Sequence, residues 1–261
     1  MMRFITLTLL GIISATPSFA QDNNDKIKNA TASQSSTVSA VSPALEHYMQ
    51  AVIQNDLWKR PQLSLRDRSL VTLAVMVSRN QTSELSAELN RALDNGVKPS
   101  EISELITHLA FYSGLGNATG ASGITKSVFE ERGISPDQLP AATPVLLPID
   151  RQQEAKRAEI AEKSAGGVSP GLVKFTTKVL FQSLWLRPDL IPRDRSLITV
   201  TSLISNGQVG QIGFHLNKAM DNGLSREQVG EVITQIAFYA GWPNAFSAVP
   251  VVDEVINKRA R

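Results

Sequence analysis

Histidine is scarce in this chain of 261 residues, and the position of one histidine suggests proton transfer. Glu104 precedes His108 by four residues, so on a helix the two side chains share one face. A carboxylate in that position can fix the tautomer of the imidazole and raise its pKa, as in an acid–base couple. A structural pair at the edge of the core is the alternative. His47 stands near the start of the ordered region, where we expect a solvated side chain.

The sequence contains two diverged copies of one unit. Residues 57–132 and 184–259 share 31 identical residues in 76 ungapped positions, at a constant offset of 127. Chance does not produce such agreement, and the period is too long for a solenoid. The chain therefore carries a duplicated domain, and the two copies can be compared position by position.

The duplication divides the histidines between the copies. His215 of the second copy corresponds to Glu88 of the first, and His108 of the first copy corresponds to Gln235 of the second. Either the copies have drifted or specialised, or one composite site has kept both histidine positions while the other has decayed.

A pair of arginines recurs at the start of a predicted helix in each copy. Arg66 and Arg193 each open the sequence Arg-Asp-Arg-Ser-Leu. Arginine is well suited to hold a substrate carboxylate, because its planar guanidinium can donate two parallel hydrogen bonds. The motif also carries its own counter-charge. A salt-bridge network that ties the helix starts to a neighbouring helix or subunit is therefore the alternative, and we favour it slightly.

Other kinds of active site find little support in the sequence. The chain has no cysteine, which excludes disulfides and thiol chemistry. Three separated histidines without a His-x-x-x-His spacing do not suggest a metal site, and glycine-rich phosphate loops are absent. We therefore expect no metal and no organic cofactor. The net charge of +2, without a dense basic cluster, argues against a nucleic-acid partner.

Apolar residues at helical spacing run through both copies and predict an all-α fold. The first helix of each copy is predicted over residues 45–57 and 172–184. The second helix is predicted to begin at Ser64, which forms a capping pattern with Asp67, and the third to end at Gly96. The buried stripe of the second helix is predicted to contain Leu70, Leu73, Ala74 and Val77.

The first twenty residues have the pattern of a secretory signal. Arg3 precedes a short apolar run, and small residues occupy the cleavage-determining positions of Ser18-Phe19-Ala20. We therefore expect export to the periplasm and no membrane association after signal removal; a retained N-terminal anchor is the alternative. The predicted segments are a signal peptide over 1–20, a disordered stretch over 21–42, a first helical domain over 43–134, a connector over 135–170 and a second helical domain over 171–261.

Several motifs together resemble one known family. Residues 215–223 read His-Leu-Asn-Lys-Ala-Met-Asp-Asn-Gly, and residues 231–245 end in Ala-Phe-Tyr-Ala-Gly-Trp-Pro-Asn-Ala. With Arg-Asp-Arg-Ser-Leu, these motifs resemble the carboxymuconolactone decarboxylase family over both copies. The resemblance implies an all-α fold of the alkylhydroperoxidase D type that assembles into ring-like homo-oligomers such as trimers. Thiol peroxidases of that type use a Cys-x-x-Cys motif, but the corresponding positions here hold Gln208 and Gln211.

The resemblance implies a cofactor-independent lyase that acts on a small carboxylated or lactone substrate by proton transfer. A non-catalytic ligand-binding or assembly module that kept only the fold is the alternative. The candidate residues are His215, His108, Glu231 and Glu104 for proton transfer, Arg66 and Arg193 for the substrate carboxylate, and Asn90 and Asn217 for a developing enolate.

Overall fold

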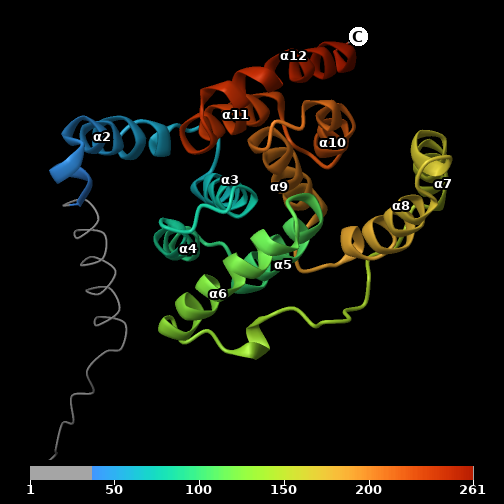
Figure 1. The fold of residues 1–261 in the computed structure, drawn as a ribbon, viewed down its shortest axis with the longest axis horizontal. Coiled ribbons are helices and arrows are strands. Elements are labelled where there is room, and N and C mark those ends of the chain that lie inside the picture. The colour runs from blue at the N-terminus through green and yellow to red at the C-terminus, as the bar shows by residue number, and fades with distance from the viewer. Residues whose placement is uncertain (1–36, 261) are drawn as a thin grey trace, which may run out of the picture.

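The computed structural model describes residues 37–260, and the regular elements within that range are all helical (Figure 1). This confirms the predicted all-α class. The predicted signal peptide over 1–20, and most of the predicted disordered stretch over 21–42, lie outside the described residues. Residues 37–41 are helical, and the amide of Ser42 donates to the carbonyl of Val38 at 2.7 Å. Helical structure therefore begins before residue 43, where we had expected order to start.

The two copies contain the same series of helices. The first copy comprises α2 (Pro43–Tyr48), a wider helical turn η1 (Met49–Gln54), a short turn η2 (Leu57–Lys59), α3 (Leu65–Ser78), α4 (Leu85–Asp94), α5 (Pro99–Tyr112) and α6 (Leu115–Glu131). The second copy comprises α8 (Pro170–Phe175), η5 (Thr176–Phe181), η6 (Leu184–Leu186), α9 (Pro192–Ser205), α10 (Val209–Asp221), α11 (Arg226–Ala240) and α12 (Trp242–Arg259). The connector holds η3 (Pro136–Gln138), α7 (Arg151–Ala161) and η4 (Glu162–Gly166).

The helix ends follow the local sequence signals. The Ser64 hydroxyl accepts a hydrogen bond from the amide of Asp67 at 3.1 Å and caps α3, as predicted. Gly96 follows α4 with φ 85°, and Gly223 follows α10 with φ 101°. These left-handed conformations are strained for other residues and close the helix ends.

The central helices α3 and α9 are buried on nearly every side. Beyond its first two residues, each helix is buried throughout its length. The predicted stripe of four apolar residues in α3 is therefore part of a much larger buried surface. The predicted stripe includes only part of the buried residues of α3, because this helix packs against α4, α9 and α11 on different faces.

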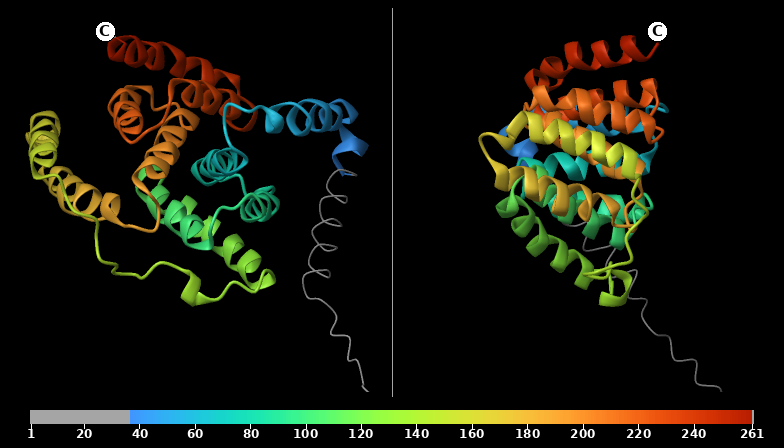
Figure 2. Two further views of the ribbon diagram at one scale, coloured as in Figure 1. Left: turned by 180° about the vertical axis from the view of Figure 1, so that it is seen from behind. Right: turned by 90° about the vertical axis from the view of Figure 1, so that its right-hand side faces the viewer.

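The two copies interlock to form one body. Helix α5 of the first copy packs against α9 of the second, and α11 of the second packs against α3 of the first. A single apolar core runs through both copies. Seen from the side, α12 and α6 lie at opposite ends of this body (Figure 2). Any site formed where α5 meets α9, or α11 meets α3, therefore draws residues from both copies.

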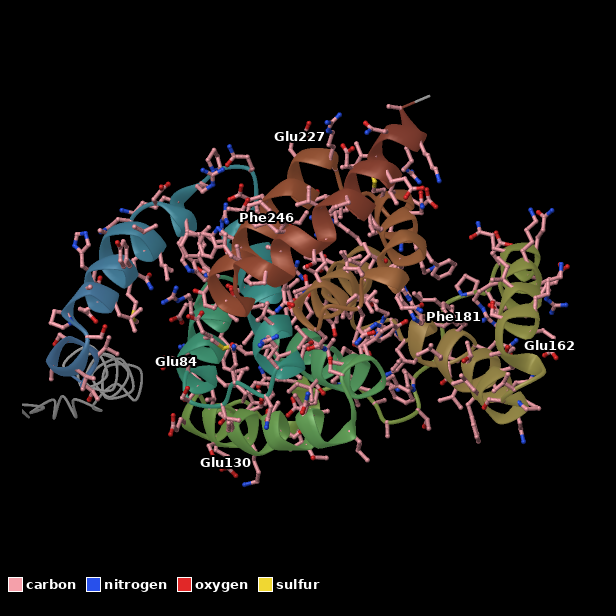
Figure 3. The ribbon with its side chains drawn as sticks, turned by 45° about the horizontal axis from the view of Figure 1, so that its top comes forward. Glu84, Glu130, Glu162, Phe181, Glu227 and Phe246 are labelled. Atoms are coloured by element: carbon pink, nitrogen blue, oxygen red, sulfur yellow. The ribbon has the colours of Figure 1, made fainter. Side chains whose placement is uncertain are left out.

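Two helical arms extend from the body. The arm of α2 and η1 lies on one side, and the arm of α7 and α8 lies on the other (Figure 1). Phe181, at the end of η5, lies where the second arm meets the body (Figure 3). None of the described helices is long and apolar enough to cross a membrane.

Candidate active site

The structure brings the two separated histidines together. His108, on α5, stacks on Tyr112 with ring centroids 4.8 Å apart and meets the ring of Trp185 edge-on at 5.1 Å. His215, on α10, meets Tyr112 at 5.4 Å and stacks on Trp185 at 6.0 Å. We call these four residues the histidine cluster. Two of them come from each copy, which is the arrangement expected of one composite site.

Hydrogen bonds hold His108 in one neutral form. Arg195 Nη1 donates to His108 Nδ1 at 3.3 Å, so this ring nitrogen accepts and the proton lies on Nε2. Nε2 then donates to Thr199 Oγ1 at 2.7 Å, and that hydroxyl donates to the Arg195 carbonyl. Burial, followed by the charge of Arg195, lowers the pKa of His108 well below its usual value. Both ring nitrogens of His108 are therefore engaged.

Glu104 pairs with the guanidinium of Arg195 rather than with the imidazole of His108. Its carboxylate accepts from Arg195 Nη2 at 2.9 Å and from Arg187 Nε at 2.8 Å, and it is fully buried. Arg195 therefore bonds both Glu104 and His108, whereas our sequence analysis considered a direct pair. Two arginines around one carboxylate satisfy a charge that would be costly to bury alone.

His215 is the histidine of the cluster that has a ring nitrogen without a hydrogen-bond partner. Its side chain is only 8% exposed, and its Nδ1 has no hydrogen-bond partner among the described residues. Burial, and to a lesser degree the ammonium of Lys218, lowers the pKa of His215 to about 4. The imidazole is therefore neutral at pH 7, and its Nδ1 is free to form a hydrogen bond.

The other interface between the copies holds a related cluster without histidine. Arg68 Nη1 donates to Gln235 Oε1 at 2.9 Å, and Gln235 Nε2 donates to Thr72 Oγ1 at 3.1 Å. The Gln235 amide thus reproduces both hydrogen bonds of the neutral His108. Trp58 Nε1 donates to the Tyr239 hydroxyl at 2.9 Å, the same distance that separates Trp185 Nε1 and the Tyr112 hydroxyl. We call Gln235, Tyr239, Trp58 and Glu88 the glutamine cluster.

One acidic residue, Glu88, belongs to the glutamine cluster, and another, Glu231, lies beside it. Glu88 takes the place of His215, and burial raises its pKa to about 7. Glu231 accepts from Arg68 at 2.7 Å and from Arg60 at 2.8 Å. The structure therefore places Glu231 with Gln235, and Glu104 is the carboxylate beside the histidine cluster.

The predicted substrate-binding arginines pair with carboxylates of the protein. Arg66 Nη2 lies 2.7 Å from an oxygen of Asp194, and Arg193 Nη2 lies 2.6 Å from an oxygen of Asp67. These reciprocal ion pairs join the starts of α3 and α9. This placement favours the structural alternative, a network that ties the copies together.

The predicted enolate donors also have internal partners. Arg132 Nε donates to Asn90 Oδ1 at 2.6 Å, and Arg259 Nη1 donates to Asn217 Oδ1 at 3.2 Å. Both amide groups donate to a carbonyl of their own helix. Each asparagine therefore fastens the last helix of its copy. His47 is exposed on α2, as expected.

A pocket of about 470 Å³ lies beside the histidine cluster, between the connector and α10. Trp185, Phe214 and Lys218 line it. Trp185 and Phe214 both contact the ring of His215, at 6.0 and 5.0 Å between centroids. Sequence reasoning missed these residues and the connector wall; the one available signal was the recurrence of Trp58-Lys59-Arg60-Pro61 as Trp185-Leu186-Arg187-Pro188 in the second copy.

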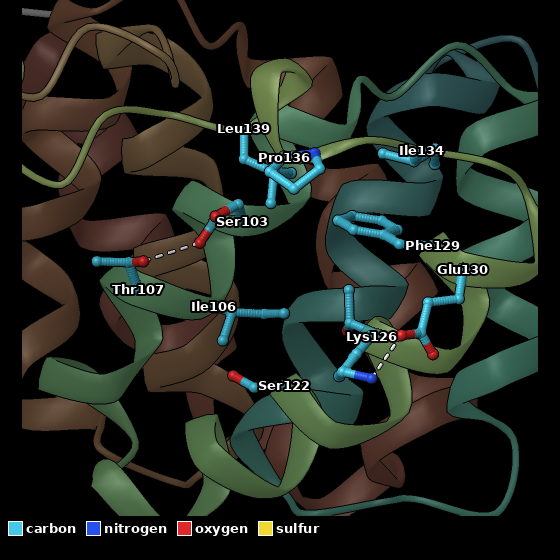
Figure 4. Close-up of a pocket in the computed structure, with 11 residues that line it drawn as sticks. Ser103, Ile106, Thr107, Ser122, Lys126, Phe129, Glu130, Ile134, Pro136 and Leu139 are labelled. Atoms are coloured by element: carbon cyan, nitrogen blue, oxygen red, sulfur yellow. Dashed lines mark hydrogen bonds and ion pairs between the residues drawn. The ribbon is translucent and has the colours of Figure 1, made fainter.

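A second pocket, of about 450 Å³, lies between α5 and α6 (Figure 4). Ile106 and Phe129 form part of its apolar surface, and the Thr107 hydroxyl is bonded to the carbonyl of Ser103. Lys126, at its edge, pairs with a glutamate of its own helix. No residue of the histidine cluster lines this pocket, whereas Trp185 of that cluster lines the first one, so we place the candidate active site at the histidine cluster and the first pocket. No group of three or more potential metal ligands converges within residues 37–260.

Comparisons with known proteins give a consistent result. The sequence profile of the Carboxymuconolactone decarboxylase family matches residues 43–127 and 170–254. A 4-carboxymuconolactone decarboxylase from Acinetobacter baylyi is 33% identical over 94 residues, which cover 36% of this chain and 70% of the relative. A nitrosuccinic acid decarboxylase from Metarhizium robertsii is 30% identical over 81 residues, covering 31% of this chain and 57% of the relative.

A solved structure supports the fold. The crystal structure of a proposed gamma-carboxymuconolactone decarboxylase subunit from Burkholderia xenovorans LB400 superposes with a TM-score of 0.51. It covers 94% of this chain and 99% of that subunit, at 16% identity. At this level of identity the similarity concerns the fold alone.

Proposed function

Since the chain belongs to the carboxymuconolactone decarboxylase family, we propose that it is a cofactor-independent decarboxylase that acts at the histidine cluster on a small carboxylated substrate. The family and its decarboxylase relatives support a decarboxylase-like function. The observation that carries the choice of site is His215, a buried neutral imidazole with an unbonded Nδ1 beside a pocket.

Decarboxylation needs an acceptor for electrons and a donor for one proton. The bond between the carboxylate and its carbon breaks, carbon dioxide leaves, and the electron pair moves into an adjacent group such as a lactone carbonyl. A proton then adds to the carbon that lost the carboxylate. The reaction therefore consumes one proton and requires no redox partner.

We assign the donation of that proton to His215. A substrate carboxylate beside Lys218 offsets the repulsion between this ammonium and the imidazolium, and so raises the pKa of His215. The imidazole takes up a proton when the anion binds and gives it to the substrate carbon after carbon dioxide has left. His108 keeps its neutral form and positions Tyr112 and Trp185 around the reacting group.

Export and self-association are further parts of the proposal. The signal pattern of residues 1–20 supports a periplasmic location. An apolar groove on α11 and α12, where Trp242 is 50% exposed and Phe246 is 67% exposed, supports a homo-oligomer. A ring-like arrangement such as a trimer is the form that we expect.

Release of carbon dioxide from two acids tests the function. The purified chain is incubated with 4-carboxymuconolactone or nitrosuccinic acid in deuterated water, and gas and product are analysed. We expect carbon dioxide and one deuterium in the product from at least one acid. His215→Gln should lower kcat about 100-fold or more, the size of a general acid–base contribution, with an unchanged melting temperature. Absence of turnover with both acids would favour the non-catalytic module.

A further inference from the structure

The pocket beside the histidine cluster does not open directly onto His215. Its lining includes Phe214 and Lys218 of α10, but among the described residues that line it His215 is absent. Two rings line the pocket and also contact the imidazole. Trp185 stacks on the imidazole at 6.0 Å between centroids, and Phe214 meets it edge-on at 5.0 Å. A substrate in the pocket therefore has to pass one of these two rings to reach His215.

The ring of Trp185 is held in place by its surroundings. The residue is buried, and its Nε1 donates to the Tyr112 hydroxyl at 2.9 Å. Phe181 stacks on the indole with centroids 5.9 Å apart and planes only 6° from parallel. Displacement of this ring would break the hydrogen bond and leave a cavity in packed surroundings, and both changes are costly. Trp185 is therefore a fixed wall between the pocket and His215.

The ring of Phe214 is free to move. The residue is 46% exposed, and it has no polar side-chain atom that could anchor it. It meets His215 edge-on, and it meets Phe181 edge-on with centroids 6.3 Å apart. Contacts of this kind contribute little each, and exposed side chains change rotamer within nanoseconds. Phe214 is therefore the ring that can turn away from the imidazole without disturbing the core.

The connector fixes the surface against which Phe214 packs. The guanidinium of Arg157, on α7, lies over the Phe181 ring at 4.2 Å from its centre. Arg157 also donates to Glu154 at 2.7 and 2.8 Å and to the Thr177 hydroxyl at 3.0 Å. These bonds hold Phe181 and α7 together at the edge of the pocket. The position of Phe214 over the imidazole is thereby defined on the side of the connector as well as on that of α10.

From these contacts we infer that Phe214 is a gate between the pocket and His215. In the closed position its ring covers the imidazole and keeps water away from it. When a substrate enters the pocket, the ring turns outward and the imidazole meets the substrate. This inference rests on the proposed function for the role of His215, but access to the imidazole can be measured without turnover.

Modification of the histidines of the full chain by diethyl pyrocarbonate at pH 7 tests this inference, with the rate at each histidine followed by peptide mass spectrometry. The reagent modifies imidazoles that it can reach, so a closed gate lowers the rate in proportion to the time it stays closed. We expect His215 to react at least tenfold more slowly than the exposed His47. Phe214→Ala should raise the rate at His215 at least fivefold. The rate at His47 should stay unchanged, and the fully buried His108 should not react in either chain, which shows that the variant is folded.

The chain offers a matched control for this substitution. The first copy has Ala87 at the position of Phe214, so alanine is compatible with this place on the helix. Phe175→Ala removes a similarly exposed ring from α8 that does not line this pocket, and it should leave the rate at His215 unchanged. An unaltered rate in Phe214→Ala, or an equal increase in Phe175→Ala, would overturn the inference even in an active enzyme. If the rate rises only in Phe214→Ala but neither acid is decarboxylated, the gate stands and the proposed decarboxylase function fails.

Discussion

Gln235 indicates which property of His108 the fold requires. The amide makes the same two hydrogen bonds as the neutral imidazole, to an arginine and a threonine at corresponding positions. An amide cannot take up a proton at neutral pH, so the hydrogen-bonding pattern does not depend on titration. Proton transfer therefore falls to His215, whose Nδ1 has no such bond.

This comparison predicts unequal effects of two substitutions at His108. His108→Gln should preserve both hydrogen bonds and change the free energy of unfolding by less than about 1 kcal/mol. His108→Ala leaves an Arg195 donor and a Thr199 acceptor unpaired beside a cavity, and should cost about 2–4 kcal/mol. Denaturant unfolding measures both values. An equal loss for the two variants would show that His108 does not act through these bonds.

Glu88 should make the stability of the protein depend on pH. Its pKa is about 7 in the folded state and 4.5 in its ordinary state, so the folded chain binds more protons between these values. The stability due to the protonated carboxyl is present below pH 4.5 and is lost as the pH rises through 7, by about 3 kcal/mol at most.

Substitution of Glu88 tests this dependence. Glu88→Gln cannot ionise, so its advantage in melting temperature over the original chain should be small at pH 5 and should grow by several degrees at pH 8. Glu130→Gln, at an exposed position on α6, serves as the control and should show no such growth. A constant difference between Glu88→Gln and the original chain across this range would show that Glu88 does not titrate near neutrality.

At the scale of helices, the two copies offer a comparison of helix caps. Ser64 caps α3 with its side chain, whereas Ile191 at the start of α9 provides no side-chain cap. Ser64→Ala should therefore cost about 1 kcal/mol of unfolding free energy. Ile191→Ala, at a position that is 52% exposed, should cost clearly less. Chemical denaturation of the pair gives the answer, and equal losses would rule out a capping role for Ser64.

Local signals predicted the helices well and their surroundings less well. Caps and stops at Ser64, Gly96 and Gly223 are encoded within a few residues, so the sequence identifies them. The burial of α3 on all faces depends on helices of the other copy, which no local periodicity records. No part in the site was predicted for the connector, yet residues of its helix α7 line the pocket.

At the scale of the molecule, the duplication determines how the site is built. Because α5 packs on α9, His108 of the first copy lies with Trp185 and His215 of the second. The sequence identified both histidines and left open whether they formed one site. Their convergence depends on the interlocking of the copies, which comparison of the copies alone does not show. Arg195 was missed for the same reason, since its side-chain partners Glu104 and His108 belong to the first copy.

The central claim is that one of two related clusters carries the chemistry. The most direct test is kcat for carbon dioxide release by His215→Gln and Glu88→Gln, which alter corresponding positions. The assay uses whichever of the two acids the unsubstituted chain decarboxylates. We predict a loss of about 100-fold or more for His215→Gln and a change of less than about twofold for Glu88→Gln. Comparable losses in both variants, or a loss only in Glu88→Gln, would contradict the assignment of the active site to the histidine cluster.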